Sequence, residues 1–296
     1  MAGSALVIVN RDSRQGQQDL DPALALLRSR GIQLELVEGL SAEEASDAIR
    51  SNRGRVDRVL VGGGDGTLQG VASALHETSL PLGILPLGTA NDLANSLGLP
   101  TDLRGAAETI VAGHVRQIDL ASANDVLFFN VAHIGLAARV NARLTKDVKQ
   151  RWGRWSYLRT LLSTVGERRS FSVLLEHGST RERFRSIQLS VGNGGRYGGG
   201  MQISEAALDD GLLHICSVAP AGLGKLLGVF LRLRSGQAED AREMRLLHLK
   251  EFMVRTRRRM RVTAGGEWIT ETPVRFRVLP AAVRVYTGFQ KEKESV

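Results

Sequence analysis

The chain has 296 residues, which exceeds one typical domain of roughly 100 to 200 residues and favours two domains. Hydrophobic residues make up 43% of the chain, which is enough to form hydrophobic cores and excludes a disordered or fibrous protein. Cys216 is the one cysteine, which excludes an internal disulfide or a multi-cysteine zinc site and predicts a cytoplasmic protein. The N-terminus has the wrong charge order for a secretory signal, and we expect no membrane span.

The net charge of +8 is unevenly distributed. Residues 1–120 hold 10 arginines, no lysine and 15 acidic residues, a net charge of −5, whereas the remainder holds 29 basic and 16 acidic residues, a net charge of +13. Such a basic surface can serve an anionic membrane, a nucleic acid or solubility. Because 5% aromatic residues offer little base stacking, no nucleic-acid partner is expected.

The first 120 residues alternate short apolar runs with helix-like stretches. The runs predict strands over 5–9, 32–37, 56–61 and 81–85. Helices are predicted between Asp21 and Gly31, from Ser41 to about Gly54, after Thr67, after Asn91 to near Gly98, and from Thr101 to Gly113. Asp21 as N-cap before Pro22, and a capping box of Ser41 and Glu44, mark the first two helix starts. This alternation predicts a parallel sheet with crossover helices.

After residue 120 the pattern changes to β-like runs. Strands are predicted over 126–130, 170–176, 187–191 and 212–218, which indicates a mostly antiparallel domain. Residues 251–262 have a period of two and predict one strand, with an apolar face and a stripe of arginines at 255, 257, 259 and 261. That stripe is either a solvated strand face or a surface that contacts phosphates.

Two glycine-rich turns provide the main chemical signal. The first is GGGDGT at 62–67, after an apolar strand and before a helix, and the second is LGTAND at 87–92, one βα unit later. Glycines allow backbone amides and a helix N-terminus to approach phosphate oxygens, and neighbouring strand ends converge on one crevice. A Rossmann fingerprint fails in register, and a Walker A loop lacks its lysine. Asp65 and Asp92 beside phosphates imply Mg²⁺ or an oriented acceptor hydroxyl.

These residues resemble the diacylglycerol-kinase-type catalytic domain, with the strongest likeness to YegS-like bacterial lipid kinases. The resemblance rests on GGGDGT at 62–67, PLGTANDLA at 86–94, GNGGRYGGG at 192–200, LDDGLL at 208–213 and VLPAAVRV at 278–285. NAD kinases share a GGDGT loop and a related fold. The second loop and the downstream glycine-rich segment here are similar to the lipid-kinase form.

The resemblance implies a fold and an activity. It implies an α/β N-terminal nucleotide-binding domain with a parallel sheet, over residues 1–121 with a return segment at about 279–290. It also implies a C-terminal all-β sandwich domain for the lipid, over residues 122–278. The activity would be an ATP-dependent lipid kinase that transfers the γ-phosphoryl group of Mg-ATP to a hydroxyl of diacylglycerol, phosphatidylglycerol or a sphingoid-like lipid.

The same resemblance implies site residues. Those that would contact ATP are Asn10, Gly62, Gly63, Gly64, Asp65, Gly66, Thr67, Leu68, Gln69, Gly70, Gly88, Thr89 and Asn91. The catalytic residues would be Asp65, Asp92 and Glu267, with Glu267 as general base. Asp210, with the carbonyls of Ala207 and Leu212, matches a family cation site for Mg²⁺ or Ca²⁺.

The sequence departs from the family pattern at two places. Asn10-Arg11 stands where the family has Asn-Pro, and Gly265 stands where the family has the aspartate of an Asp-Gly-Glu turn. The alternatives to a lipid kinase are therefore an NAD kinase-like enzyme and a non-catalytic regulator that binds nucleotide or lipid.

The segment 141–169 is rich in basic residues and contains Trp152 and Trp155 at helical spacing. It predicts either peripheral docking on an anionic membrane surface, where the lipid substrate lies, or an aromatic stripe packed on the sandwich.

Overall fold

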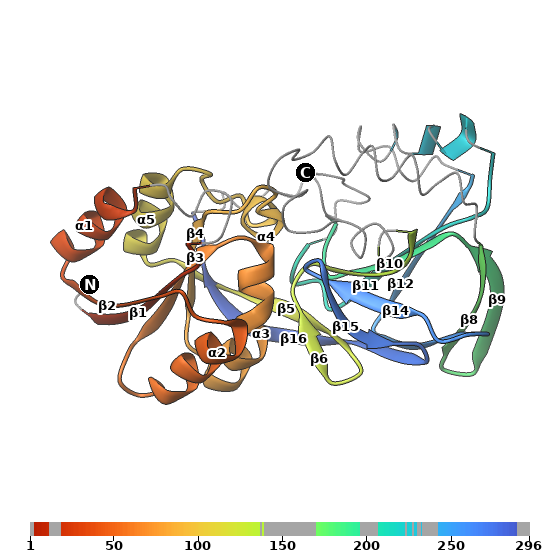
Figure 1. Ribbon diagram of the computed structural model, residues 1–296, viewed down its shortest axis with the longest axis horizontal. Coiled ribbons are helices and arrows are strands. Elements are labelled where there is room, and N and C mark those ends of the chain that lie inside the picture. The colour runs from red at the N-terminus through yellow and green to blue at the C-terminus, as the bar shows by residue number, and fades with distance from the viewer. Residues whose placement is uncertain are drawn as a thin grey trace, which may run out of the picture. The chain divides into compact units, whose positions relative to one another are not determined.

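A computed structural model describes residues 3–11, 19–136, 138, 170–195, 207–222, 224–226, 228, 229, 232 and 242–288 (Figure 1). The chain divides into two compact units, one formed by Met1–Ile118 with Ala281–Val296 and the other by Asp119–Pro280. The chain passes from one unit to the other inside β5 (Val115–Ala123) and again inside β16 (Val274–Tyr286).

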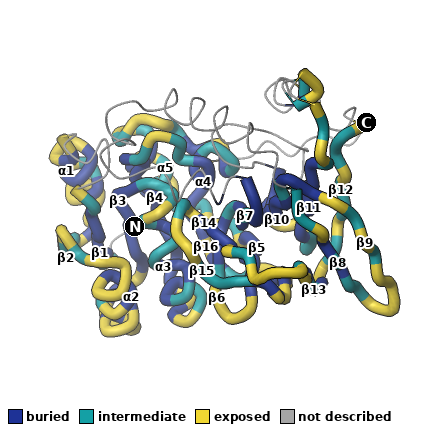
Figure 2. The backbone as a smooth tube through the Cα atoms, turned by 45° about the vertical axis from the view of Figure 1, so that its right-hand side comes forward, coloured by how far each residue is buried: buried dark blue, intermediate teal, exposed yellow. Residues whose placement is uncertain are grey.

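The first unit contains the parallel sheet that the sequence predicts. Its strands are β1 (Gly3–Val9), β2 (Ile32–Glu38), β3 (Arg58–Gly63) and β4 (Leu82–Pro86), in the order β2-β1-β3-β4. The end of β16 adds a further parallel strand, because Val285 pairs with Leu82. In Figure 2 the central strands β3 and β4 are buried.

In the described part of the first unit, five helices cover this sheet. They are α1 (Asp21–Ser29), α2 (Ala42–Ser51), α3 (Asp65–Thr78), α4 (Asp92–Ser96) and α5 (Leu103–Ala112). Leu24 and Leu27 of α1 pack with Ile110 of α5 over one face of the sheet, and α2 and α3 lie together on the other face (Figure 1).

The helix starts differ in one place from the sequence prediction. The capping box is confirmed, since the Ser41 amide donates to Glu44 Oε2 at 2.8 Å and the Glu44 amide donates to Ser41 Oγ at 3.3 Å. Asp21, however, is the first residue of α1 rather than its N-cap, which is Leu20. The Asp21 amide is instead bound by the Asp19 carboxylate at 2.9 Å, so an aspartate two residues earlier accepts from the helix start.

The predicted first glycine loop is shorter than its motif. β3 extends through Gly63 and α3 begins at Asp65, so Gly64 alone connects them. The strand extends this far because its glycines still pair with the neighbouring strands. Gly62 pairs with Val9 on one side and Leu85 on the other, and Gly63 pairs with Pro86.

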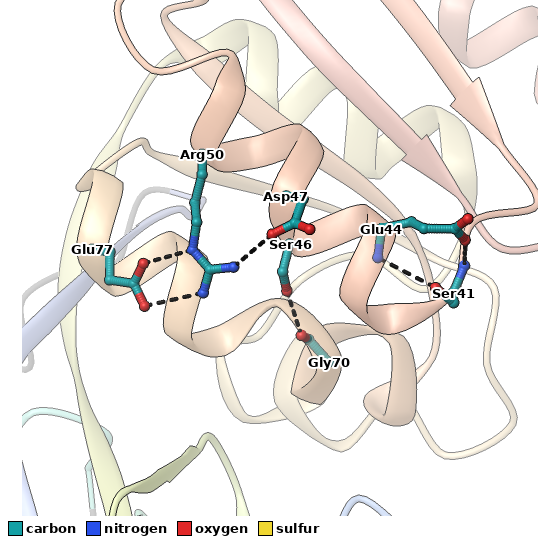
Figure 3. A network of polar contacts seen from close by, with 7 residues as sticks. All are labelled: Ser41, Glu44, Ser46, Asp47, Arg50, Gly70 and Glu77. Atoms are coloured by element: carbon teal, nitrogen blue, oxygen red, sulfur yellow. Dashed lines mark hydrogen bonds and ion pairs between the residues drawn. The ribbon is translucent and has the colours of Figure 1, made fainter.

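Helices α2 and α3 are joined by close packing and polar contacts (Figure 3). Ser46 Oγ donates to the Gly70 carbonyl at 2.8 Å, and a Cβ on Gly70 would lie 2.7 Å from Ala42 Cβ. Arg50 binds the Glu77 carboxylate with two hydrogen bonds of 2.7 and 3.1 Å. This pair holds the pKa of Glu77 below its usual range, mainly through the Arg50 hydrogen bond, but both side chains are about half exposed and the pair adds little stability.

The second unit is the antiparallel β-sandwich that the sequence predicts. One sheet orders the first part of β16, β13 (Glu251–Thr256), β8 (Phe171–His177) and β9 (Thr180–Ser186), with β5 pairing β16 and β6 (Val126–Phe128). The other orders β12 (Met244–Leu249), β11 (Leu213–Val218), β10 (Gln188–Gly192), β7 (Val131–Gly135), β14 (Arg261–Ala264) and β15 (Glu267–Glu271).

Aromatic rings form the centre of the sandwich core. The ring of Phe276 stacks on Phe252 with centroids 5.2 Å apart and meets the edge of Phe128 at 6.4 Å. All three side chains are buried, and they share one cluster with Ile134 and Leu189 of the opposite sheet. Burial of such rings supplies a large share of the stability of a domain.

The single strand predicted over 251–262 is wrong. β13 ends at Thr256, a turn follows, and β14 begins at Arg261 in the other sheet. Hydrogen bonds between Met260 and Thr272 hold this turn, one from the Met260 amide to Thr272 Oγ1 at 3.0 Å and one from the Thr272 amide to the Met260 carbonyl at 2.9 Å. The predicted arginine stripe is thus broken up: Arg255 lies in one sheet, Arg261 in the other, and Arg257 and Arg259 in the connection between them.

The contact of Gly70 with Ala42 gives a stability prediction. Gly70→Ala should destabilise the first unit by about 1 kcal/mol, because an overpacking cost of roughly 1–3 kcal/mol exceeds the gain in helix propensity of up to about 1 kcal/mol. Ala42→Gly should restore the loss in the double variant, as measured by urea denaturation. Equal effects of Gly70→Ala with either residue at position 42 would contradict the packing role.

Candidate functional site

The first glycine-rich turn places a helix N-terminus at the end of a strand. Gly64 is the N-cap of α3, and the hydrogen-bond ladder of the helix begins with the Leu68 amide, which donates to the Gly64 carbonyl at 3.1 Å. The amides of Asp65, Gly66 and Thr67 precede this first bond and therefore point out of the helix start. Backbone amides in this position favour an anion such as phosphate.

The second glycine-rich turn is braced by its own asparagine. Asn91 has a left-handed backbone, with φ of +48°, which this residue type tolerates. Its side chain accepts from the Gly88 amide at 2.9 Å and donates to the Gly88 carbonyl at 3.0 Å. Asn91 therefore shapes the turn, and Thr89 is exposed at its tip.

The two turns touch through their glycines. A Cβ on Gly64 would lie 2.9 Å from Gly88 Cα, and a Cβ on Gly88 would lie 2.6 Å from Gly64 Cα. The Leu87 amide also donates to the Gly63 carbonyl at 3.0 Å. The predicted convergence of the two turns is thus present, and glycine is needed at both positions because the backbones are in contact.

Asp65 joins the two turns directly. Its Oδ2 accepts from the Asp92 amide at 3.1 Å, and its Oδ1 accepts from the Leu93 amide at 3.2 Å. The carboxylate therefore caps the start of α4, a role that the motif did not predict. Asp92 itself is buried, with only 7% of the residue exposed.

The remaining predicted nucleotide residues have packing roles as well. Asn10 Nδ2 donates to Thr67 Oγ1 at 3.0 Å and so links β1 to α3. The Thr67 side chain fills the space where a Gly63 side chain would lie, since a Cβ there would be 2.6 Å away. Leu68 is buried, Gln69 is half-buried and Gly70 faces α2.

The predicted cation residues form a compact loop in the second unit. Asp210 Oδ1 accepts from the Leu212 amide at 2.9 Å, and Asp210 Oδ2 lies 2.8 Å from His214 Nε2. Burial lowers the pKa of His214 and its bond to Asp210 partly offsets this, so the ring is mainly neutral at pH 7 and donates to the carboxylate. Two hydrogen bonds leave lone pairs on Asp210 for a further contact.

Two further residues, which the sequence reasoning missed, complete this loop. Asp119, 2% exposed, accepts from the Gly211 amide at 2.8 Å, and its own carbonyl accepts from Asn193 Nδ2 at 2.6 Å. The sequence does contain a signal for Asp119, because an acidic residue within an apolar strand indicates a specific polar role. Asn193 Oδ1 is buried without a hydrogen-bond partner among the described residues, and Gly194 lies against the Ala207 carbonyl.

The oxygen atoms of this loop are the kind of ligand that a hard divalent cation prefers. A buried amide oxygen without a partner is an acceptor that a cation or its bound water would satisfy. Within the described ranges no cluster of three or more His, Cys, Asp or Glu side chains could hold a metal ion. The loop therefore suits one carboxylate with carbonyl ligands rather than an acidic cage.

Glu267 follows a tight hairpin turn between β14 and β15. Ala264 pairs with Glu267, and Gly265 and Gly266 between them have φ of +58° and +87°, the values of a type I′ turn. The Glu267 side chain is exposed. Trp268 beside it is 58% exposed, with the Arg261 guanidinium 4.9 Å from the centre of its ring.

Two sequence predictions fall outside the described residues. They are the downstream glycine-rich motif at 196–200 and the basic, tryptophan-containing segment 141–169. Among the helices that the structure describes, none is both long enough and apolar enough to cross a membrane.

Known proteins share both units. Residues 4–123 match the family model of the diacylglycerol kinase catalytic domain, and residues 130–287 match that of the YegS C-terminal NAD kinase β-sandwich-like domain. A Pseudomonas putida protein named "Probable lipid kinase YegS-like" is 30% identical over 290 residues, covering 97% of this chain and 96% of that protein. A Klebsiella pneumoniae protein of the same name is 34% identical over 220 residues, covering 72% and 73%.

A solved structure agrees with this relationship. The crystal structure of a diacylglycerol kinase from Bacillus anthracis is 26% identical and superposes with a TM-score of 0.78, covering 96% of this chain and 97% of that chain. The chain therefore belongs to the diacylglycerol kinase family of enzymes, and within it to the YegS-like members.

The dual position of Asp65 gives a prediction with a matched control. Asp65→Ala should destabilise the first unit by about 1 kcal/mol, because it removes the cap of α4. Asp102→Ala removes a comparable cap, since Asp102 Oδ1 accepts from the Gly105 amide at 2.8 Å at the start of α5. Urea denaturation should show similar losses for both variants.

Only Asp65→Ala should also weaken ATP binding in calorimetry, because Asp65 belongs to a glycine-rich motif whereas Asp102 lies outside both motifs. If both variants bind ATP like the wild type, the placement of the nucleotide at these turns is wrong.

Proposed function

We propose that this enzyme transfers the γ-phosphoryl group of ATP to a hydroxyl group of a membrane lipid. The observation that supports it most is the backbone contact of Gly64 with Gly88, which sets two strand-to-helix turns side by side. Such turns suit a polyphosphate, because their amides are donors without bulky side chains. The match to the diacylglycerol kinase catalytic domain supports a lipid alcohol as acceptor.

The first unit would bind the nucleotide. The amides at the start of α3 would hold phosphate oxygens, and the positive end of the helix dipole would favour their charge. Asp65 keeps the start of α4 in place through two hydrogen bonds, and Asp92 would help to organise the phosphates and acceptor. Phosphoryl transfer depends chiefly on such positioning.

Glu267 would act as general base. The acceptor hydroxyl oxygen would form a bond to the γ-phosphorus while the bond from that phosphorus to the bridging oxygen breaks, which releases ADP. The hydroxyl proton would pass to the Glu267 carboxylate, which is exposed on its hairpin. Glu267→Gln should then lower the rate without loss of ATP binding.

A divalent cation would neutralise charge when bound, with Mg²⁺ as the expected ion and Ca²⁺ as the alternative. Asp210 and the carbonyls of Ala207 and Leu212 would hold a cation in the second unit, with Asn193 Oδ1 as a further acceptor. We infer that the enzyme works in the cytoplasm, at the membrane surface where its acceptor lies.

An ATP-dependent screen tests the activity. With radiolabelled ATP, we expect transfer to lipid in vesicles that contain diacylglycerol, phosphatidylglycerol, a sphingoid base or ceramide, and no transfer to NAD. Transfer to NAD alone would contradict the lipid-kinase proposal and support the NAD kinase hypothesis. ATP binding without transfer to any acceptor would identify a non-catalytic regulator.

The turn at Gly265 allows a sharper test of catalysis. Gly265→Asp should fold as well as the wild type, because Asp-Gly is favoured in a type I′ turn and aspartate tolerates the left-handed backbone. If a carboxylate here assists proton transfer, the rate should rise roughly tenfold or more.

Gly265→Asn is the matched control, since it suits the same turn without adding a charge. It should keep the wild-type rate. An equal change in both variants would show that turn geometry, rather than the carboxylate, sets the rate.

A further inference from the structure

An unusual number of arginines lies on one side of a single sheet in the second unit. Strands β9, β8, β13 and the first part of β16 are adjacent in that order, and they bury their other side in the sandwich core. We call the outward side the arginine face. Its arginines are Arg181, Arg183 and Arg185 of β9, Arg255 of β13, and Arg275 and Arg277 of β16.

The register of the strands places these arginines side by side. Leu174 of β8 is directly opposite Arg183 on one side and Arg255 on the other. Directly opposed residues of an antiparallel pair point to the same side of the sheet. Glu176 likewise faces Arg181 and Met253, and Met253 in turn faces Arg275, so all these side chains share the outward side.

The burial pattern agrees with the register. All six arginines are exposed, with side-chain exposures of 76% for Arg181, 51% for Arg255 and 60% for Arg275. The residues that alternate with them along β13 and β16, such as Val254 and Phe276, are buried. Figure 2 shows the tip of the β8–β9 hairpin as exposed.

Acidic residues offset only part of this charge. Glu176 binds Arg255 at 2.7 Å and Arg181 at 3.0 Å, and Glu251 binds Arg275. Six arginines against these two glutamates leave an excess of four positive charges on the face. Arg183, Arg185 and Arg277 have no carboxylate partner among the described residues.

We propose that the arginine face docks the protein on the surface of an anionic phospholipid bilayer. The proposal rests on the proposed function, which requires the enzyme to reach an acceptor in a bilayer. Guanidinium groups form paired hydrogen bonds with phosphate oxygens, and several basic residues together hold a protein at an anionic leaflet. The arginines of this face lie outside the segment 141–169, for which the sequence predicts either membrane docking or packing on the sandwich.

Other occupants fit this face less well. A second copy of the chain would bring two sets of like charges together, which opposes association. A single-stranded nucleic acid would need aromatic side chains for stacking, and the outward residues between the arginines are Ser172, Leu174, Glu176, Glu251 and Met253. A bilayer with anionic headgroups requires only positive charge over an extended surface.

Vesicle co-sedimentation of the full chain tests the proposal. The variant replaces Arg183, Arg185 and Arg277 with glutamine, and the matched control replaces Arg30, Arg53 and Arg55, which are exposed in the first unit. The probes are vesicles of phosphatidylcholine with phosphatidylglycerol, and vesicles of phosphatidylcholine alone.

We expect binding to the anionic vesicles only, weakened by salt. The variant should bind roughly a hundredfold more weakly, because each basic residue near an anionic surface contributes roughly a factor of five. The control should bind like the wild type, and urea denaturation should show that both remain folded. Unchanged binding by the variant, or salt-insensitive binding by the wild type, would overturn the proposal.

Two further measurements separate this proposal from the proposed function. Kinase activity on an acceptor lipid dispersed in neutral detergent micelles should be equal in the variant and the wild type. If vesicle binding depends on the arginines but no lipid is phosphorylated in micelles, the docking surface stands and the kinase proposal fails. Binding of the wild type to duplex DNA and not to anionic vesicles would assign the face to nucleic acid and overturn the docking proposal.

Discussion

The contact between Gly64 and Gly88 is the constraint on which the first unit depends. Each glycine lies where a side chain on either would meet the backbone of the other, so the two turns approach as closely as backbones can. The parallel register of β3 and β4 brings them to this point, since the last residues of the two strands, Gly63 and Pro86, pair with each other. Asp65 then links the two turns, because its carboxylate accepts hydrogen bonds from two backbone amides at the start of α4. The proposed phosphate-binding turns and a rigid connection between them are thus built from the same residues.

The second unit separates two tasks on the two sides of the same strands. Phe252 and Phe276 turn inward and stack in the core, whereas Arg255 and Arg275 alternate with them and turn outward. Because side chains alternate along a strand, core stability and surface charge can be changed almost independently. This explains how a sandwich with an apolar interior also presents a strongly basic exterior.

The fold class and the two glycine turns were predictable because each depends on local pattern. Strand and helix periods, the Ser41 capping box and the glycine motif are features of neighbouring residues. The roles of Asp65 and Gly70 were not predictable, since two backbone amides of α4 define the first and Ala42 of α2 defines the second. The continuous strand over 251–262 failed because a period of two persists through a turn that moves the chain to another sheet. Asp119 and Asn193 were missed because their contact joins residues far apart in the chain.

The sequence by itself determined which segments become strands and helices, where glycine replaces side chains at the strand ends, and which family the chain resembles. Those properties follow from spacing along the chain, which sets the hydrophobic period and the turn chemistry. Only the tertiary structure decided that arginines from β9, β13 and β16 occupy one face, and that two glycines meet across adjacent strands. The reason is that strand order and register are fixed by long-range pairing, and a one-residue shift would turn every side chain to the opposite face.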